Sequence, residues 1–186
     1  MTMEALNFFE LGLLQGLQEA VGCPLLDKLT VAISVTGDKG IGLIILALVL
    51  LCIPRTRKVG VVVAVALVLD LLLVNLTLKP LVARVRPYDL GIDLNLITHH
   101  PSDYSFPSGH TAVAFAGAVA LYAAGKKWMR IGLVYACCMG FCRMYLLMHY
   151  PTDVLFGALC GAACGVAALY LCKRVEAALL HRRKAL

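Results

Sequence analysis

The stretch GVVVAVALVLDLLLVNLTL, residues 60–78, decides the fold, because it is a nearly continuous apolar run about as long as a membrane helix. A helix needs about 20 apolar residues to cross the hydrocarbon core of a bilayer. Similar runs lie on both sides of it, at Gly40–Ile53, Ser108–Gly125, Met129–Leu147 and Thr152–Cys172. The pattern therefore predicts an all-α, polytopic membrane helix bundle with five transmembrane helices.

The region before these runs predicts further helices. Residues 30–36 either lengthen the first span or form a sixth one, because Gly37-Asp38-Lys39-Gly40 is typical of a turn. Ahead of them, Met3–Ala20 alternates apolar and polar residues at helical spacing, which predicts an amphipathic helix lying at the membrane interface. This acidic start lacks the basic leader of a secretory signal, so we expect it to be retained. We predict a single domain, 1–186, with interfacial helices in 1–37 and a transmembrane core in 38–186.

The composition agrees with a membrane location. Hydrophobic residues make up 61% of the 186 residues, and the mean hydropathy of +0.85 exceeds that of soluble globular proteins. Eleven of the seventeen Lys and Arg residues form three groups of the kind that marks cytoplasmic loops. These are Arg55, Arg57 and Lys58; Lys126, Lys127 and Arg130; and Lys173, Arg174, Arg182, Arg183 and Lys184. Membrane topology thus explains the net charge of +6, and we expect no nucleic-acid partner.

The first of three polar clusters follows the run 60–78 and consists of Lys79, Arg86 and Pro87. The two cations are seven residues apart, about two helical turns, so we predict that both point to one side of the span before Pro87 ends it. Arg86 offers a two-pronged donor and Lys79 a compact charge, and both suit a phosphate. The alternative is a pair of interfacial cations that extend toward lipid headgroups.

The second cluster, Pro107-Ser108-Gly109-His110, lies immediately before an apolar run. This order predicts Ser108 as the N-cap of a helix whose first free N–H groups belong to Gly109 and His110, and helix N-termini bind anions. Gly109 allows a close approach to phosphate oxygens, and His110 could protonate a leaving oxygen. The alternative is an ordinary capped helix with an interfacial histidine.

The third cluster contains Arg143, His149 and Asp153. Asp153 could accept a hydrogen bond from one ring nitrogen of His149, which would leave the other nitrogen free as a nucleophile. Arg143 would neutralise charge that develops on a transferred phosphoryl group. The alternative is a helix-capping aspartate beside an interfacial histidine.

Taken in order, Lys-x6-Arg-Pro, Pro-Ser-Gly-His and Arg-x5-His-x3-Asp closely resemble the three signature motifs of the type 2 phosphatidic acid phosphatase superfamily. The resemblance covers residues 79–153 and implies a helical core shared with vanadium haloperoxidases. It also implies a metal-independent hydrolysis in two steps through phosphohistidine, with no cofactor. The implied roles are nucleophile for His149, orienting partner for Asp153, acid for His110, and phosphate binding for Lys79, Arg86, Ser108, Gly109 and Arg143.

One position departs from the family pattern. The residue before Arg143 is usually Ser in the family, and here it is Cys142. A thiol is a weaker hydrogen-bond donor than a hydroxyl, so we expect weaker phosphate binding without loss of activity.

The expected substrate is a lipid phosphate. A phosphate site at the outer membrane interface would be level with lipid headgroups, while the apolar chain of the lipid stays in the bilayer. We expect a multi-pass protein of the cell membrane with an extracytoplasmic active site. The resemblance to short bacterial members favours undecaprenyl diphosphate, while phosphatidylglycerol phosphate and phosphatidic acid also fit. A haloperoxidase is disfavoured by the five spans, and a non-catalytic membrane protein by the presence of both histidines, Asp153 and the cations. The oligomeric state is not predicted.

Other polar residues receive no catalytic role. Asp70 lies inside the run 60–78, where a carboxyl group must be neutral or paired. We interpret His99 and His100 as solvent-exposed residues of the loop 88–106, and Asp93 and Asp103 as ordinary polar residues of it. The alternative for the two aspartates is that they modulate the entry of an anionic headgroup.

Overall fold

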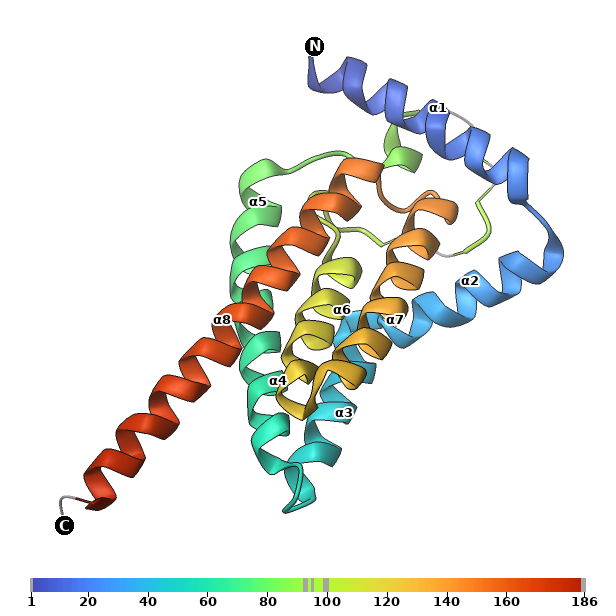
Figure 1. Cartoon of the computed structure of the whole chain (residues 1–186). Helices are drawn as coiled ribbons and strands as arrows, with labels where there is room; N and C mark the ends of the chain where they lie inside the picture. Colours follow the sequence, from blue (N-terminus) through green and yellow to red (C-terminus); the bar gives the residue numbers. More distant parts are fainter. Residues whose placement is uncertain (1, 92–93, 95, 99–100, 185–186) are drawn as a thin grey trace.

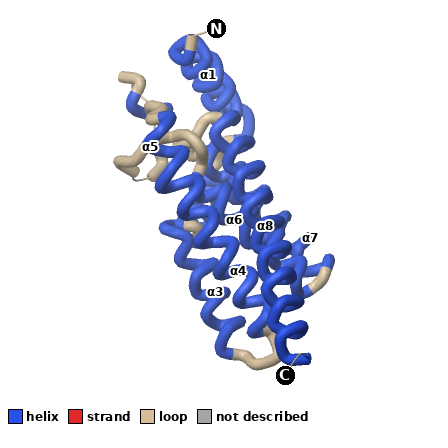
Figure 2. The backbone as a smooth tube through the Cα atoms, turned by 90° about the vertical axis from the view of Figure 1, so that its left-hand side faces the viewer, coloured by secondary structure: helices blue, strands red, loops and turns tan. Residues whose placement is uncertain are grey.

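The computed structural model describes residues 2–91, 94, 96–98 and 101–184, so Asp93, His99 and His100 lie outside the described residues. All regular secondary structure in these ranges is helical (Figure 1, Figure 2). The elements are α1 (Met3–Val21), α2 (Pro24–Thr36), η1 (Asp38–Gly40), α3 (Ile41–Cys52), α4 (Arg57–Asp70), the π-helix η2 (Leu71–Leu78), α5 (Lys79–Val82), η3 (Pro87–Asp89), α6 (Gly109–Ala120), η4 (Leu121–Ala124), α7 (Lys126–Tyr145) and α8 (Pro151–Lys184).

Each of the five predicted apolar runs forms a helix. By length and composition, two helices in the described part of the chain can cross a membrane, namely the continuous helix through α4, η2 and α5, and α8. The helices α2 and α3 meet at a bend of 43° and would add a third span if they act as one. Gly109–Ala124 is apolar but shorter. The all-α architecture is confirmed, while the number of five or six spans stays a prediction.

The helix α6 packs against α4, α7 and α8. Its approach to α8 depends on glycines spaced four residues apart on one face of α8. A Cβ atom at Gly157 would lie 2.6 Å from the carbonyl oxygen of Ser108, and one at Gly161 would overlap the carbonyl oxygen of Ala112. This close packing brings the beginnings of the two helices together, and the backbone N–H of Ser108 donates to the carbonyl oxygen of Asp153 (3.0 Å).

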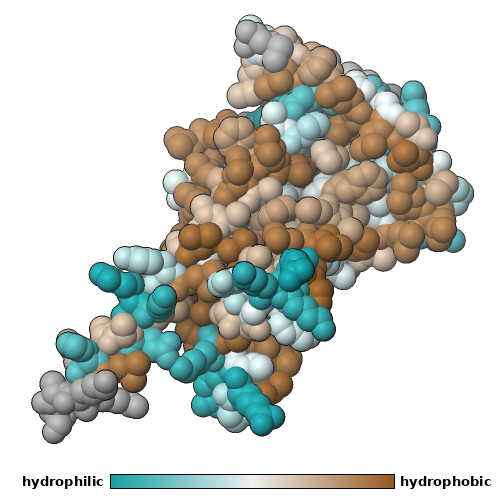
Figure 3. All heavy atoms as spheres, viewed as in Figure 1, coloured by the Kyte–Doolittle hydropathy of each residue, from teal (hydrophilic) through white to brown (hydrophobic). Residues whose placement is uncertain are grey.

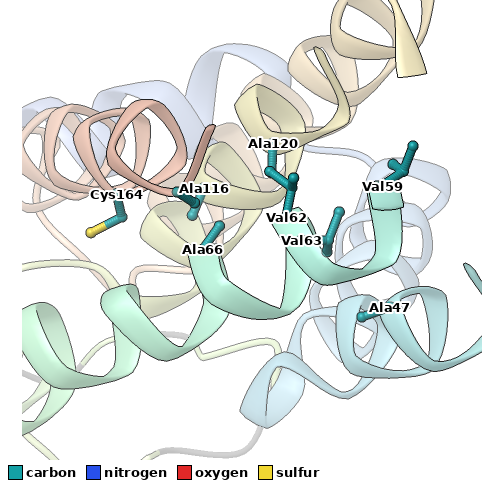
Figure 4. Close-up of a cluster of buried hydrophobic side chains, with 9 residues drawn as sticks. Ala47, Val59, Val62, Val63, Ala66, Ala116, Ala120 and Cys164 are labelled. Atoms are coloured by element: carbon teal, nitrogen blue, oxygen red, sulfur yellow. The ribbon is translucent and has the colours of Figure 1, made fainter. Parts of the chain in front are cut away.

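The other half of the bundle is fastened by a core of small side chains. These residues come from α3, α4, α6 and α8 and meet around α4 (Figure 4). The cluster consists of Ala47, Val59, Val62, Val63, Ala66, Ala116, Ala120, Cys164 and Ala168. It holds the helix that carries Lys79 beside the helix that begins after Ser108.

The N-terminal helix α1 lies across the end of the bundle near α5 (Figure 1, Figure 2). Its buried side is mixed: Asn7 and Glu10 are buried together with Leu11 and Leu14, whereas Phe9 is exposed. Asn7 and Glu10 bind a buried arginine described below. The placement of α1 at a membrane interface stays a prediction.

Charged residues gather at the opposite end. The cations of the α3–α4 turn, of the start of α7 and of Lys173 and Arg174 on α8 are exposed. Figure 3 shows the hydrophilic surface concentrated toward the C-terminal part of α8, while apolar surface covers much of the bundle. The loops that carry the three polar clusters lie at the other end, beside α1 (Figure 1).

Candidate active site

Lys79 and Arg86 of the first cluster converge, but not along a helix. The helix α5 ends at Val82, and Ala83 adopts a left-handed conformation with φ of 49°. The prediction that both cations share one side of a continuing helix is therefore wrong, because the chain turns before Arg86. The two side chains meet instead on Asp103, which accepts from Lys79 Nζ and, at 2.5 Å, from Arg86 Nη2.

Asp103 is thus more than an ordinary polar loop residue, and that interpretation was wrong. Partial burial alone would raise the pKa of Asp103, but the hydrogen bonds and charges of Lys79 and Arg86 outweigh it and lower the pKa to about 2. The carboxylate is therefore charged at neutral pH and occupies the point where the two cations converge.

The second cluster forms a helix start as predicted. Ser108 is the N-cap of α6, and its Oγ accepts from the backbone N–H three residues later. A Cβ atom at Gly109 would lie 2.9 Å from Oδ1 of Asn75, so a larger residue would displace the Asn75 side chain. Nε2 of His110 lies 2.9 Å from Oδ1 of Asp38 in the turn between α2 and α3. Asp38 orients the histidine and was not predicted from the sequence.

In the third cluster, His149 and Asp153 are fully buried and adjacent. His149 Nδ1 lies 3.7 Å from Asp153 Oδ2, and the hydroxyl of Ser105 donates to the same oxygen at 2.5 Å. The other ring nitrogen, Nε2, faces Nη1 of Arg86 at 3.4 Å. Burial, reinforced by the charge of Arg86, lowers the pKa of His149 well below its usual value. The ring is therefore neutral at neutral pH, as a nucleophile must be.

The guanidinium of Arg143 has more hydrogen-bond donors than it uses among the described residues. Its Nη1 donates to the hydroxyl of Ser34 at 2.6 Å, whereas Nε and Nη2 are buried and make no hydrogen bond among the described residues. Buried polar groups are almost always hydrogen-bonded, and a charged group without partners is costly. Two unpaired guanidinium nitrogens therefore indicate a place for an anion.

A cavity of about 960 Å³ joins these groups to an apolar space. One end is lined by Lys79, Asp103, Gly109, His110 and Arg143. The rest is lined mainly by apolar residues of α3 and α4, including Leu48, Leu51, Leu67 and Val68. Four predicted site residues lie behind this lining, linked to it by the hydrogen bonds above: Arg86, Ser108, His149 and Asp153. Such a cavity can hold an anionic group together with a hydrocarbon chain.

Arg84 and Glu10 join the cluster without having been predicted. The guanidinium of Arg84 donates to Asp153 Oδ1 at 2.6 Å and to Glu10 Oε2 at 2.5 Å. The only sequence signal was a cation in an apolar segment, two residues before Arg86. No local pattern links it to Glu10, which is 74 residues away.

Two residues singled out in the sequence lie near the site. Asp70 lines the same cavity, and its Oδ1 finds no hydrogen-bond partner in the described ranges. Cys142 is buried on α7, next to Arg143 in the sequence. Its effect on phosphate binding stays a prediction. Within the part of the chain that the structure describes, no three His, Cys, Asp or Glu side chains are grouped as a metal site.

Comparison with known proteins places this geometry in context. The family model described as the PAP2 superfamily matches residues 57–176. An undecaprenyl-diphosphatase of Sulfolobus acidocaldarius is 35% identical over 138 residues, 74% of this chain and 66% of that protein. A decaprenylphosphoryl-5-phosphoribose phosphatase of Mycobacterium tuberculosis is 37% identical over 131 residues, 69% of this chain and 71% of that protein.

Among solved structures, LpxE of Aquifex aeolicus superimposes with a TM-score of 0.74 at 33% identity, covering 86% of this chain and 94% of that one. The chain spans between about half and two thirds of the length of several curated relatives that it matches. The likeness to LpxE extends over nearly the whole of the solved chain, so the fold itself is shared.

Proposed function

Because this chain belongs to the PAP2 superfamily, we propose that it is an integral membrane lipid phosphatase that works through a phosphohistidine intermediate without a metal ion. The observation that carries the proposal is the pair of buried, unpaired nitrogens of Arg143 in a cavity that also exposes Lys79 and His110. The cations Lys79, Arg86 and Arg143 lie around His149, and the N-terminus of α6 is close by. Cations and free N–H groups in this arrangement are suited to a tetrahedral phosphate.

In the first step, His149 Nε2 attacks phosphorus. An N–P bond forms while the bond to the leaving oxygen breaks, and His110 gives its proton to that oxygen. Lys79, Arg86 and Arg143 stabilise the charge on the equatorial oxygens, together with the N–H groups at Gly109 and Ser108. Asp153, near Nδ1 of His149, offsets the positive charge that the imidazole acquires.

In the second step, water attacks the phosphohistidine. His110, now unprotonated, takes a proton from this water as the N–P bond breaks, and inorganic phosphate leaves. His149 returns to its neutral form, which its buried position favours. Asp38 keeps the ring of His110 in place through both steps.

The substrate that we favour is undecaprenyl diphosphate. The apolar walls formed by α3 and α4 suit a hydrocarbon chain, and the Sulfolobus relative is named an undecaprenyl-diphosphatase. Phosphatidylglycerol phosphate and phosphatidic acid are the alternatives, since both combine a phosphate with apolar chains. Lipids of the surrounding membrane would be the other partners.

We further propose a single domain that crosses the cell membrane several times and opens its active site on the extracytoplasmic side. Support comes from the exposed cations at the opposite end of the bundle, because cytoplasmic loops are rich in Lys and Arg. Residues 1–37 would lie at the interface, with the exposed Phe9 and Leu13 of α1 in contact with lipid.

The direct test is phosphate release by the detergent-purified protein in EDTA from undecaprenyl diphosphate, phosphatidylglycerol phosphate and phosphatidic acid. We expect release, with the fastest rate from undecaprenyl diphosphate. Faster turnover of either glycerolipid would replace the favoured substrate, and activity that requires an added divalent cation would contradict the metal-independent mechanism.

A prediction concerns Asp103, whose carboxylate holds the cations that the phosphate needs. Asp103→Asn should lower the KM by about 5-fold, because the incoming phosphate no longer displaces a charged competitor, and should change kcat little. Steady-state kinetics in mixed micelles measure both constants. A higher KM in Asp103→Asn would show that Asp103 positions the cations rather than competing for them.

A further inference from the structure

Arg84 is held at the end of the bundle by hydrogen bonds from all three guanidinium nitrogens. Its Nε donates to Asn7 Oδ1 at 2.9 Å and its Nη2 to Glu10 Oε2 at 2.5 Å, both on α1. Its Nη1 donates to Thr152 Oγ1 at 2.7 Å and to Asp153 Oδ1 at 2.6 Å, both at the start of α8. One side chain thus ties the N-terminal helix to the carboxylate that faces the proposed nucleophile.

Glu10 closes the same network from the other side. Its Oε1 accepts from the backbone N–H of Thr152 at 2.9 Å, and its Oε2 accepts from the Thr152 hydroxyl at 2.8 Å. The ring of Tyr150 lies under the guanidinium of Arg84, with 4.0 Å between Cζ and the ring centroid. The arrangement leaves Arg84 no freedom to rotate, so the Asp153 oxygen that it holds is fixed as well.

The charges of Glu10, Arg84 and Asp153 do not sum to zero. Glu10, Arg84 and Asp153 are 3%, 4% and 0% exposed, so water screens them little. Two carboxylates face one guanidinium, which leaves one negative charge on the Nδ1 side of His149, while on the Nε2 side the ring faces Arg86, itself paired with Asp103. A buried negative charge is costly unless a positive charge forms next to it. That positive charge would arise when the ring of His149 becomes phosphorylated.

We propose that Glu10 and Arg84 are positioning residues for phosphoryl transfer to His149, an inference that rests on the function proposed above. Arg84 fixes the orientation of Asp153. Glu10 takes up the charge of Arg84, so that Asp153 keeps its own charge for the imidazolium. The N-terminal helix α1 is then a component of the active site, although none of the residues that line the cavity comes from it.

The test compares Glu10→Gln with Glu19→Gln, a matched change on the exposed side of the same helix. Glutamine can still accept from Thr152 but carries no charge, so Arg84 would draw on Asp153 alone. We expect kcat to fall about 10-fold in Glu10→Gln with KM within about 2-fold of the wild type, because the phosphate-binding cations are untouched. Glu19→Gln should match the wild type in both constants.

A second pair of measurements needs no lipid substrate. Vanadate accepts a bond from a histidine nitrogen in a five-coordinate geometry like that of phosphoryl transfer, whereas inorganic phosphate binds through charge and hydrogen bonds alone. Glu10→Gln should weaken vanadate binding about 10-fold and leave phosphate binding unchanged, as measured by thermal shift or calorimetry. Arg84→Lys, which keeps the charge but loses the fork, should weaken vanadate binding as well.

Equal kcat and equal vanadate affinity in Glu10→Gln and Glu19→Gln would overturn the inference. So would equal losses of vanadate and phosphate affinity, since these would indicate a general loss of structure. If the wild type hydrolyses none of the three lipids, the proposed function fails, but the ratio of vanadate to phosphate affinity still decides the role of Glu10.

Discussion

Replacing His149 by alanine should abolish lipid phosphate hydrolysis, with a loss of at least about 10⁴-fold in kcat. The imidazole is the only side chain in the proposed mechanism that forms a bond to phosphorus, so its removal leaves no first acceptor for the phosphoryl group. The measurement is phosphate release from the best lipid substrate under saturating conditions.

Two further variants separate a chemical loss from a folding defect. His149→Asn keeps most of the buried volume and should be equally inactive while melting near the wild-type temperature. His181→Ala removes an exposed histidine from the far part of α8 and should keep full activity. Turnover above about 1% of the wild type in both His149 variants would mean that another group is the nucleophile.

The second large effect is expected at His110. His110→Ala should lower kcat by about 10² to 10⁴-fold toward phosphatidic acid, the range of general acid catalysis. The ring lines the cavity and is held by Asp38, so it is placed to protonate a leaving oxygen. Both rates come from the same phosphate release assay.

The size of this loss should depend on the leaving group. The alkoxide released from phosphatidic acid is a strong base and needs a proton as it leaves, whereas the lipid phosphate released from undecaprenyl diphosphate is a weak base. His110→Ala should therefore cost at least about 10-fold less with the diphosphate. An equal loss on both substrates would contradict the role of His110 as acid for the leaving group, and would leave it a role in phosphate binding or in the second step, which both substrates share.

The predictions that the structure confirms rest on local patterns in the sequence. The apolar runs predicted helices because helix formation and membrane burial depend on consecutive residues, and each of the five runs forms one. The N-cap at Ser108 was readable for the same reason, since capping involves only the next three residues. The four-residue spacing of His149 and Asp153 suggested that these side chains are adjacent, and they lie side by side.

The errors and omissions concern contacts between distant segments. Lys79 and Arg86 were expected on one helix face, but a left-handed residue at Ala83 ends the helix and Asp103 joins them from across the loop. No local pattern linked Glu10 of the N-terminal helix to Arg84, which it faces in the interior.

The amino-acid sequence by itself determined the helical segments, the helix cap at Ser108 and the pairing of His149 with Asp153, because each depends on neighbours within a few turns. Only the tertiary structure decided which charges pair. Arg84 with Glu10, His110 with Asp38, and Lys79 and Arg86 with Asp103 are brought together by helix packing, and buried charges must find partners wherever the packing leaves them.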